Sequence, residues 1–157
     1  MDASALRFLV VDDSELMRKV IRDVLSRLGL DDVDEAVDGV DALRLCRLTR
    51  YDLVVTDLSM PRLNGIDLLR AIRVMPGREH TAVLLASCFL SKRDIREARS
   101  AGVDGFLPKP FIEAPLTEQV TAVLERLRRV SYVLELGRGA SVDRRAEPLL
   151  AAASAGR

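Results

Sequence analysis

The sequence has little that would direct the protein to a membrane, to nucleic acid or out of the cell. The chain has 24 basic residues (lysine and arginine) and 24 acidic residues (aspartate and glutamate), so its formal net charge is zero. A neutral chain has no bulk attraction to nucleic acid or anionic lipid. No stretch approaches the ~18 uninterrupted apolar residues of a membrane helix. The opening segment lacks the basic leader and apolar run of a signal peptide. We therefore expect a soluble cytoplasmic protein with no membrane insertion.

Two further features are scarce or missing. The chain has two cysteines, Cys46 and Cys88, which lie in apolar segments without metal-ligand spacing. We predict that both are buried free thiols in a reducing compartment. A glycine-rich phosphate loop is missing after the first apolar run, where Asp12 and Asp13 stand instead. Their presence there argues against a nucleotide-binding module.

What the sequence does contain is an alternation of short apolar runs with segments of helical periodicity. Apolar residues make up 48% of the chain, enough for an ordinary core at 157 residues. The pattern predicts five strands, at residues 8–11, 33–37, 53–56, 82–86 and 105–107. Five repeats with right-handed crossovers favour an α/β fold: a flavodoxin-like doubly wound five-stranded parallel sheet in the order 2-1-3-4-5, with helices on both faces.

A helix is predicted after each strand. The first runs from the capping residue Ser14 to Gly29, and the others lie near residues 39–48, 66–72, 93–101 and 116–127. The inward faces are expected to include Leu16 in the first helix and Val40 in the second, because both fit the apolar spacing of their segments.

The periodic pattern weakens towards the C-terminus. We predict a domain at residues 1–129 and a C-terminal extension at residues 130–157. Residues 131–136 could form one more apolar turn or strand, and residues 137–157 are expected to be flexible or partly docked. The arginine pairs at residues 128–129 and 144–145 are interpreted as a solvated basic surface.

Residues of chemically reactive types follow four of the predicted strands. Asp12 and Asp13 follow the first strand, Asp57 the third, Ser87 the fourth, and Lys109 closely follows the fifth. Ligands of such sheets bind beyond the carboxyl ends of the strands, so these side chains should meet at one edge. Three carboxylates repel one another unless a cation neutralises them. A hard divalent ion with oxygen ligands suits this role, and Mg²⁺ is our candidate cofactor.

Such a cluster supports one kind of chemistry in particular. A carboxylate beside the ion can act as a nucleophile and become an aspartyl phosphate. The ion, an ammonium and a hydroxyl would then share the equatorial oxygens of the transferring phosphoryl group, and Lys109 and Ser87 have the right types for the last two roles. Taken singly, each residue has an ordinary explanation as a helix cap or a turn residue. Their joint placement at one sheet edge favours a site.

Four segments carry a resemblance to a known family: VVDDSELMRKVI, VVTDLSMPRLNGIDLLRAI, LLAS and AGVDGFLPKPF. Over residues 6–127 the chain resembles the receiver domains of two-component response regulators, and the single-domain chemotaxis type is the nearest in length. The resemblance implies that Asp57 is the phospho-acceptor. It also implies an Mg²⁺ site formed by Asp12 and Asp13, directly or through water, together with Asp57 and the backbone carbonyl of Ser59.

The resemblance further implies a switch. Ser87 would be the switch hydroxyl and Phe106 the aromatic residue that turns inward with it. Lys109 would be the cation that contacts the phosphoryl group, and its peptide bond to Pro110 would be cis. Gly65 would supply a backbone shape that other residues resist.

The sequence departs from the family's usual pattern at two of these positions, and at Cys88 and Phe89, which follow Ser87 where small or polar residues are often found. Ser87 replaces the more usual threonine, and Phe106 stands where tyrosine is common. Phe89 either crowds the mouth of the pocket and slows attacking water, or is a partly exposed packing residue.

The leading hypothesis is therefore a signalling switch that catalyses only its own phosphorylation and dephosphorylation. Its phosphoryl source would be a histidine kinase or a histidine phosphotransfer protein. Its downstream target would dock on the face formed by the fourth helix, the fifth strand and the fifth helix. A phosphorelay intermediate is the alternative.

Two other functions are less expected. A metal-dependent phosphatase normally needs a second aspartate two residues after the first, whereas Leu58 and Ser59 follow Asp57. Direct DNA binding is not expected either, because roughly thirty residues beyond the receiver-like part are too few for a helix-turn-helix domain.

Overall fold

The structure is a computed structural model that describes residues 6–111 and 113–139. These residues fall into two units, which divide between Leu124 and Glu125. The domain boundary expected after residue 129 stays a prediction. None of the described helices is both long and apolar enough to cross a lipid bilayer.

The first unit is built on a parallel sheet of five strands: β1 (Phe8–Val11), β2 (Val33–Ala36), β3 (Leu53–Asp57), β4 (Ala82–Ser87) and β5 (Gly105–Pro108). The strand order is β2-β1-β3-β4-β5, which confirms the predicted topology. β1, β3 and β4 are buried along their whole length, as their continuous apolar sequences predict for central strands covered on both faces. The register pairs Val11 with Thr56, Asp57 with Ala86 and Ser87 with Pro108, so the carboxyl ends of these strands lie at one edge.

Five helices follow the strands: α1 (Glu15–Arg27), α2 (Gly39–Leu48), α3 (Gly65–Val74), α4 (Lys92–Ser100) and α5 (Glu113–Gly139). The first four begin at a capping side chain that accepts a hydrogen bond from the backbone three residues later; the caps are Ser14, Asp38, Asn64 and Ser91. Ser14 is the cap predicted from the sequence. Short polar residues in the loops that follow the strands thus fix where these helices start.

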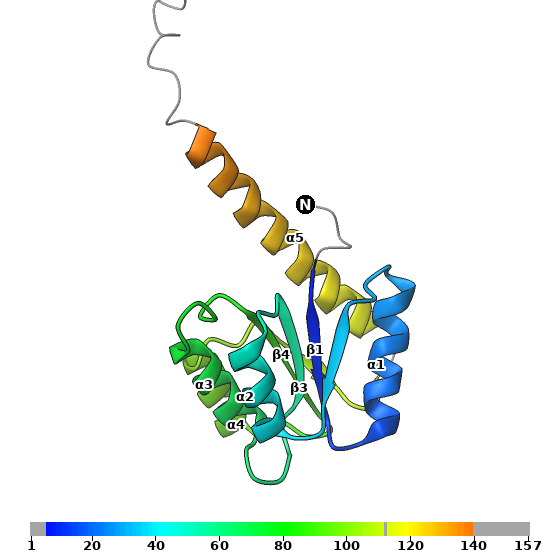
Figure 1. Ribbon diagram of the computed structural model, residues 1–157. Helices are drawn as coiled ribbons and strands as arrows, with labels where there is room; N and C mark the ends of the chain where they lie inside the picture. Colours follow the sequence, from blue (N-terminus) through cyan, green and yellow to red (C-terminus); the bar gives the residue numbers. More distant parts are fainter. Residues whose placement is uncertain (1–5, 112, 140–157) are drawn as a thin grey trace, which may run out of the picture. The chain divides into compact units, whose positions relative to one another are not determined.

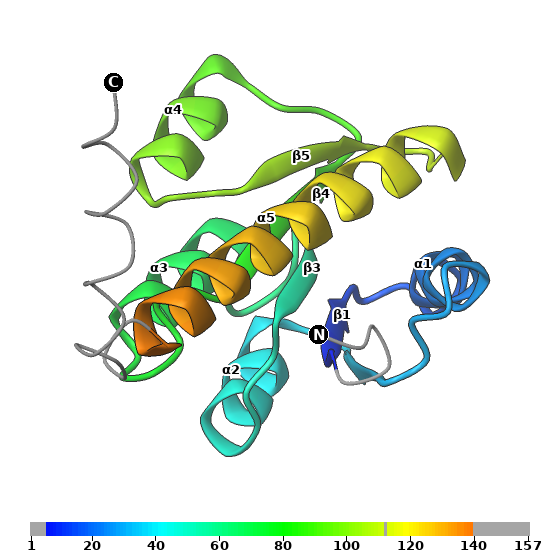
Figure 2. The same ribbon diagram turned by 90° about the horizontal axis from the view of Figure 1, so that it is seen from above.

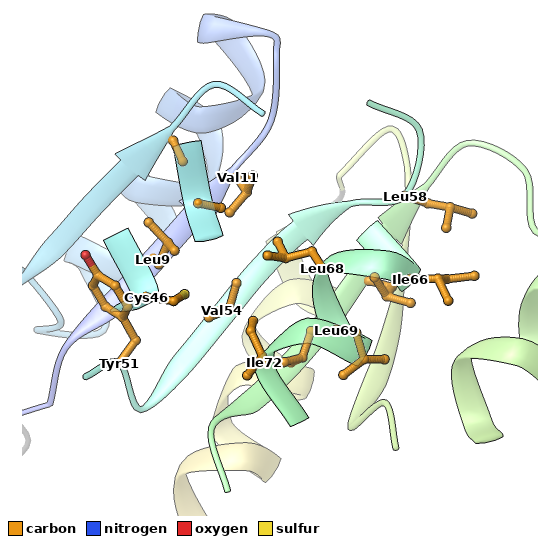
Figure 3. Close-up of a cluster of buried hydrophobic side chains, with 14 of the residues drawn as sticks. Leu9, Val11, Cys46, Tyr51, Val54, Leu58, Ile66, Leu68, Leu69 and Ile72 are labelled. Atoms are coloured by element: carbon orange, nitrogen blue, oxygen red, sulfur yellow. The ribbon is translucent and has the colours of Figure 1, made fainter. Parts of the chain in front are cut away.

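The helices cover both faces of the sheet, as predicted (Figures 1 and 2). On one face, α2, α3 and Ala98 of α4 pack against alternate strand residues, including Val83. Leu9 and Val54 belong to the same cluster (Figure 3). On the other face lie α1 and the part of α5 up to Leu124, whose first residue Glu113 accepts a hydrogen bond of 2.7 Å from Arg27 of α1. The side-chain periods of 2.0 in strands and 3.6 in helices explain this division.

Several details of the predicted packing were wrong. Leu16 and Val40 are exposed, because at 3.6 residues per turn each points away from the buried side of its helix. That side is formed by Ile21, Val24 and Leu25 in α1 and by Gly39, Ala42 and Cys46 in α2. Cys46 is buried as predicted, but Cys88 is exposed, since β4 ends at Ser87 and the next residue leaves the core. Residues 131–136 continue α5 and form neither a turn nor a strand, because no glycine or proline interrupts the helix there. Residues 140–157 lie outside the described residues.

The burial pattern of α1 leads to a first prediction. Leu25 is fully buried, whereas Leu16 in the same helix is 64% exposed. Leu25→Ala should lower the free energy of unfolding by about 2–5 kcal/mol, since it leaves a cavity in the core. Leu16→Ala should change it by no more than about 0.5 kcal/mol. Urea unfolding followed by circular dichroism measures both, and similar losses for the two variants would contradict the packing described for α1.

Candidate functional site

The carboxylates predicted to converge do so. Asp12 follows β1 directly, Asp13 comes next, and Asp57 is the last residue of β3. One ligand oxygen from each of the three lies within 4.8 Å of the other two. Asp12 and Asp57 are buried, whereas Asp13 is exposed. Parallel pairing of β1 and β3 brings these charges together although the residues are far apart in the sequence.

One ammonium group faces this cluster. The Nζ atom of Lys109 lies 2.6 Å from Oδ2 of Asp12 and 3.3 Å from Oδ1 of Asp57. The Lys109–Pro110 peptide bond is cis, as the family resemblance implied. Three carboxylates therefore meet one lysine, which leaves an excess of negative charge. Oxygen ligands with surplus negative charge fit a hard divalent cation.

The electrostatics of Asp57 and Lys109 follow from their burial and from each other. Burial raises the pKa of Asp57 above its usual value, and the charge of Asp12 acts in the same direction, while Lys109 acts against both. For Lys109, burial acts to lower the pKa, but the hydrogen bond and charge of Asp12 and the charge of Asp57 outweigh it, so the pKa is raised. Lys109 consequently stays protonated at neutral pH.

Asp12 is held by its backbone as well as by its side chain. Its N–H donates to the carbonyl of Ala36 at 3.2 Å, and its Oδ1 accepts from the N–H of Ser14 at 2.9 Å. Its carbonyl accepts a hydrogen bond of 2.8 Å from Arg18, which also donates to Glu35 of β2. The sequence analysis missed Arg18. Its place four residues after the cap Ser14, on the first turns of α1, could have pointed to it.

The two residues expected to act as the switch lie near the same edge. The Ser87 hydroxyl donates to the carbonyl of Phe89 at 2.6 Å and accepts from the N–H of Phe89 at 3.1 Å. It is thus bonded within its own loop. Phe106 is half-buried and packs against the core cluster that α2 and α3 cover. Their part in switching stays a prediction.

A cavity of about 860 Å³ opens beside Asp57. Its walls include the expected residues Ser59, Ser87 and Lys109 and the loop residues Met60 and Asn64, together with three residues that the sequence analysis did not single out: Arg93, Asp94 and Glu97. The last three belong to the first turns of α4, and the closeness of that helix to Ser87 in the sequence was a signal for them. Phe89 lines the cavity and is 77% exposed, and its effect on attacking water stays a prediction.

Gly65, the first residue of α3, is required for a different reason from the one expected. The positive backbone angles among the described residues are found at Arg62, Gly29, Gly77 and Gly102, and not at Gly65. A Cβ atom at Gly65 would instead overlap the carbonyl oxygen of Asp57 and come within 2.9 Å of the Leu85 side chain. The glycine therefore lets α3 start directly against the end of β3.

Comparison with known proteins agrees with this geometry. The family described as the response regulator receiver domain matches residues 8–121. The chain belongs to this family. As a receiver domain it is 39% identical over 122 residues to the chemotaxis protein CheY-3 of Vibrio cholerae, a match that covers 78% of this chain and 94% of that protein.

Two solved structures are similar in fold. CheY4 of Vibrio cholerae superposes with a TM-score of 0.70 at 29% identity, over 75% of this chain and 98% of that one. The receiver domain of the sensor histidine kinase PA1611 from Pseudomonas aeruginosa PAO1 superposes with a TM-score of 0.66 at 27% identity, over 78% of this chain and 97% of that one.

The surplus of negative charge leads to a second prediction. Millimolar MgCl₂ should raise the melting temperature of the receiver domain, because a cation that binds only the folded state stabilises it. Asp13→Asn should remove most of this rise, since it deletes one of three clustered carboxylates. Asp23→Asn, which neutralises an exposed acidic residue of α1 outside the cluster, should keep it. Differential scanning calorimetry with and without chelator tests this, and an undiminished rise in Asp13→Asn would contradict a metal site there.

Proposed function

We propose that this receiver domain is a cytoplasmic phospho-accepting switch, in which Asp57 takes a phosphoryl group from a histidine kinase in a Mg²⁺-dependent reaction. The observation that carries the proposal is the position of Asp57. It is the member of the acidic cluster that lines the cavity, and it lies 3.3 Å from the Lys109 ammonium. A buried carboxylate open to one cavity and next to a cation suits a nucleophile for phosphoryl transfer.

The residues of the acidic cluster fit the metal that this chemistry requires. The PA1611 receiver domain is described with a magnesium ion coordinated in its active-site cleft. In the present chain the ligands would be Asp12, Asp13, Asp57 and, by the family resemblance, the backbone carbonyl of Ser59. When bound, the ion would neutralise charge on the transferring phosphoryl oxygens.

The other steps of phosphoryl transfer would depend on side chains of the protein itself. A carboxylate oxygen of Asp57 attacks the phosphorus of a phosphohistidine, an O–P bond forms, the P–N bond breaks, and the imidazole leaves with the electron pair. Lys109 contacts both Asp12 and Asp57 before transfer, so its ammonium lies where an incoming phosphoryl oxygen needs a positive charge. Arg18 and Ser14 hold Asp12 through its carbonyl and its carboxylate, which keeps the cluster in place during the reaction.

The output of the switch would be a change in the surface next to the cavity. Of the nine residues of α4, Ala98 is the one that is fully buried, so this helix can shift with little loss of packing. After phosphorylation, Ser87 would exchange its bonds with Phe89 for one to a phosphoryl oxygen, and Phe106 would turn further inward. We propose that a target protein recognises the changed face of α4, β5 and α5.

A third prediction tests the acceptor. With a small phosphodonor such as acetyl phosphate and Mg²⁺, the protein should incorporate one phosphoryl group, and Asp57→Asn should incorporate none, because an amide is not a nucleophile here. Asp52→Asn is the matched control. Asp52 lies just before β3, at the opposite end of the strand, and an asparagine there can still accept the hydrogen bond from the Arg7 N–H. Intact-mass spectrometry measures incorporation, and label retained in Asp57→Asn or in excess chelator would refute the assignment.

A fourth prediction tests the switch. Beryllofluoride, a stable mimic of the phosphoryl group, should change amide hydrogen exchange in residues 92–100 and 105–108 of the wild type. Ser87→Ala should still accept phosphate, more slowly, but should lose most of this change because the hydroxyl that follows the phosphoryl group is gone. Ser100→Ala, at the exposed end of α4, should behave as the wild type. An unaltered exchange response in Ser87→Ala would show that switching does not run through this hydroxyl.

A further inference from the structure

The loop between β3 and α3, residues 58–64, forms one wall of the cavity. Leu58, Ser59, Met60 and Asn64 line the space next to Asp57. Two backbone hydrogen bonds shape the loop, from the N–H of Gly65 to the carbonyl of Leu58 at 2.9 Å and from the N–H of Leu63 to the carbonyl of Pro61 at 2.8 Å. The position of this loop therefore decides where Ser59 lies relative to the acidic cluster.

Arg62, at the tip of the loop, has an unusual backbone and a specific partner. Its φ of 70° is the one positive value at a non-glycine position among the described residues. L-amino acids adopt this conformation rarely, and it persists where the surroundings hold it. The Arg62 guanidinium forms an ion pair with the carboxylate of Asp38, whose side chain is only 3% exposed.

Asp38 connects the loop to the start of α2. One of its oxygens, Oδ1, accepts a hydrogen bond of 2.8 Å from the N–H of Asp41 and caps the helix, while Oδ2 meets Arg62. The next residue, Gly39, packs so closely against the loop that a Cβ atom there would overlap the carbonyl oxygen of Leu63. A buried carboxylate needs its partner charge, so the ion pair and this close packing support each other.

We propose that Asp38 and Arg62 are positioning residues for the acidic site. Their ion pair holds loop 58–64 against the first turn of α2 and thereby fixes Ser59 and Met60 beside Asp57. Neither member of the pair lines the cavity, so their influence passes through the loop. The expected change in Mg²⁺ affinity rests on the proposed function, whereas the expected change in hydrogen exchange of the loop does not.

Two substitutions distinguish an effect of loop position on Mg²⁺ affinity from a direct electrostatic effect of the two charges. Asp38→Asn removes a negative charge but keeps an equally good helix cap. Arg62→Ala removes a positive charge. A purely electrostatic influence would weaken Mg²⁺ binding in the first variant and strengthen it in the second. Positioning predicts weaker binding in both, by about tenfold, at the low end of what outer partners of metal ligands contribute. Isothermal titration calorimetry with MgCl₂ alone measures the affinity.

The same first turn of α2 offers a matched control. Asp41 and Arg44 form an ion pair of 2.8 Å that does not reach the loop. Asp41→Asn and Arg44→Ala repeat the two charge changes a few residues away, and Mg²⁺ affinity should stay within about twofold of the wild type in both, because screened surface charges act weakly at a distance. Arg62→Lys, which keeps a cation, should recover part of the lost affinity.

Hydrogen exchange in the presence of chelator tests the loop without any metal. The amides of Leu63 and Gly65 should exchange faster in Asp38→Asn and Arg62→Ala than in the wild type and the controls. If the wild type binds no Mg²⁺, the proposed function fails, while faster exchange still supports the ion pair as the holder of the loop. Opposite affinity changes in the two variants, or unchanged affinity and exchange in both, would overturn the proposal. If Arg62→Ala does not fold, Arg62→Gly replaces it, since glycine accepts the positive φ.

Discussion

Mutual repulsion among three carboxylates is the constraint around which this receiver domain is arranged. Parallel pairing of β1 with β3 brings Asp12, Asp13 and Asp57 to one edge of the sheet, and burial of two of them removes most of the screening by water. Lys109, which directly follows β5, places its positive charge within contact distance of the buried Asp12 and Asp57. Under the proposed function, this surplus of negative charge would attract a divalent cation, and the bound cation would then balance the charge of the phosphoryl oxygens.

The surroundings of the cluster differ in rigidity. On one side, Asp12 is held through its N–H, its carbonyl and its carboxylate, and loop 58–64 is packed against the start of α2. On the other side, α4 buries a single residue completely, and the Ser87 hydroxyl forms its described hydrogen bonds with the backbone of Phe89 in its own loop. Under the proposed function, the site would bind a cation reproducibly and also transmit a change, and this division would serve both. The rigid side fixes the chemistry, while the loosely packed side can respond to it at little cost.

The carboxylates that the sequence pattern predicted to converge do meet, but the resemblance to receiver domains gave the wrong reason for Gly65. Gly65 was expected for a backbone conformation that other residues resist, whereas it is needed because α3 starts against the carbonyl of Asp57. The residue with the uncommon backbone is Arg62, where the sequence offers no such signal. A positive φ at an arginine is a property of its surroundings, in this case a buried carboxylate from another loop, and local sequence does not encode that partner.

The sequence by itself determined the strand order, the cap Ser14 of α1 and the edge at which Asp12, Asp57, Ser87 and Lys109 meet. It could do so because apolar periodicity and the residues after each strand are local signals, and parallel topology converts them into proximity. Only the tertiary structure decided that Leu16, Val40 and Cys88 are exposed, and that Arg18 and the Asp38–Arg62 pair support the site. Exposure depends on which side of a helix packs on the sheet and on where a strand ends, and a long-range ion pair depends on two segments that meet only after folding. The ion pair leaves no pattern within a single segment of the chain.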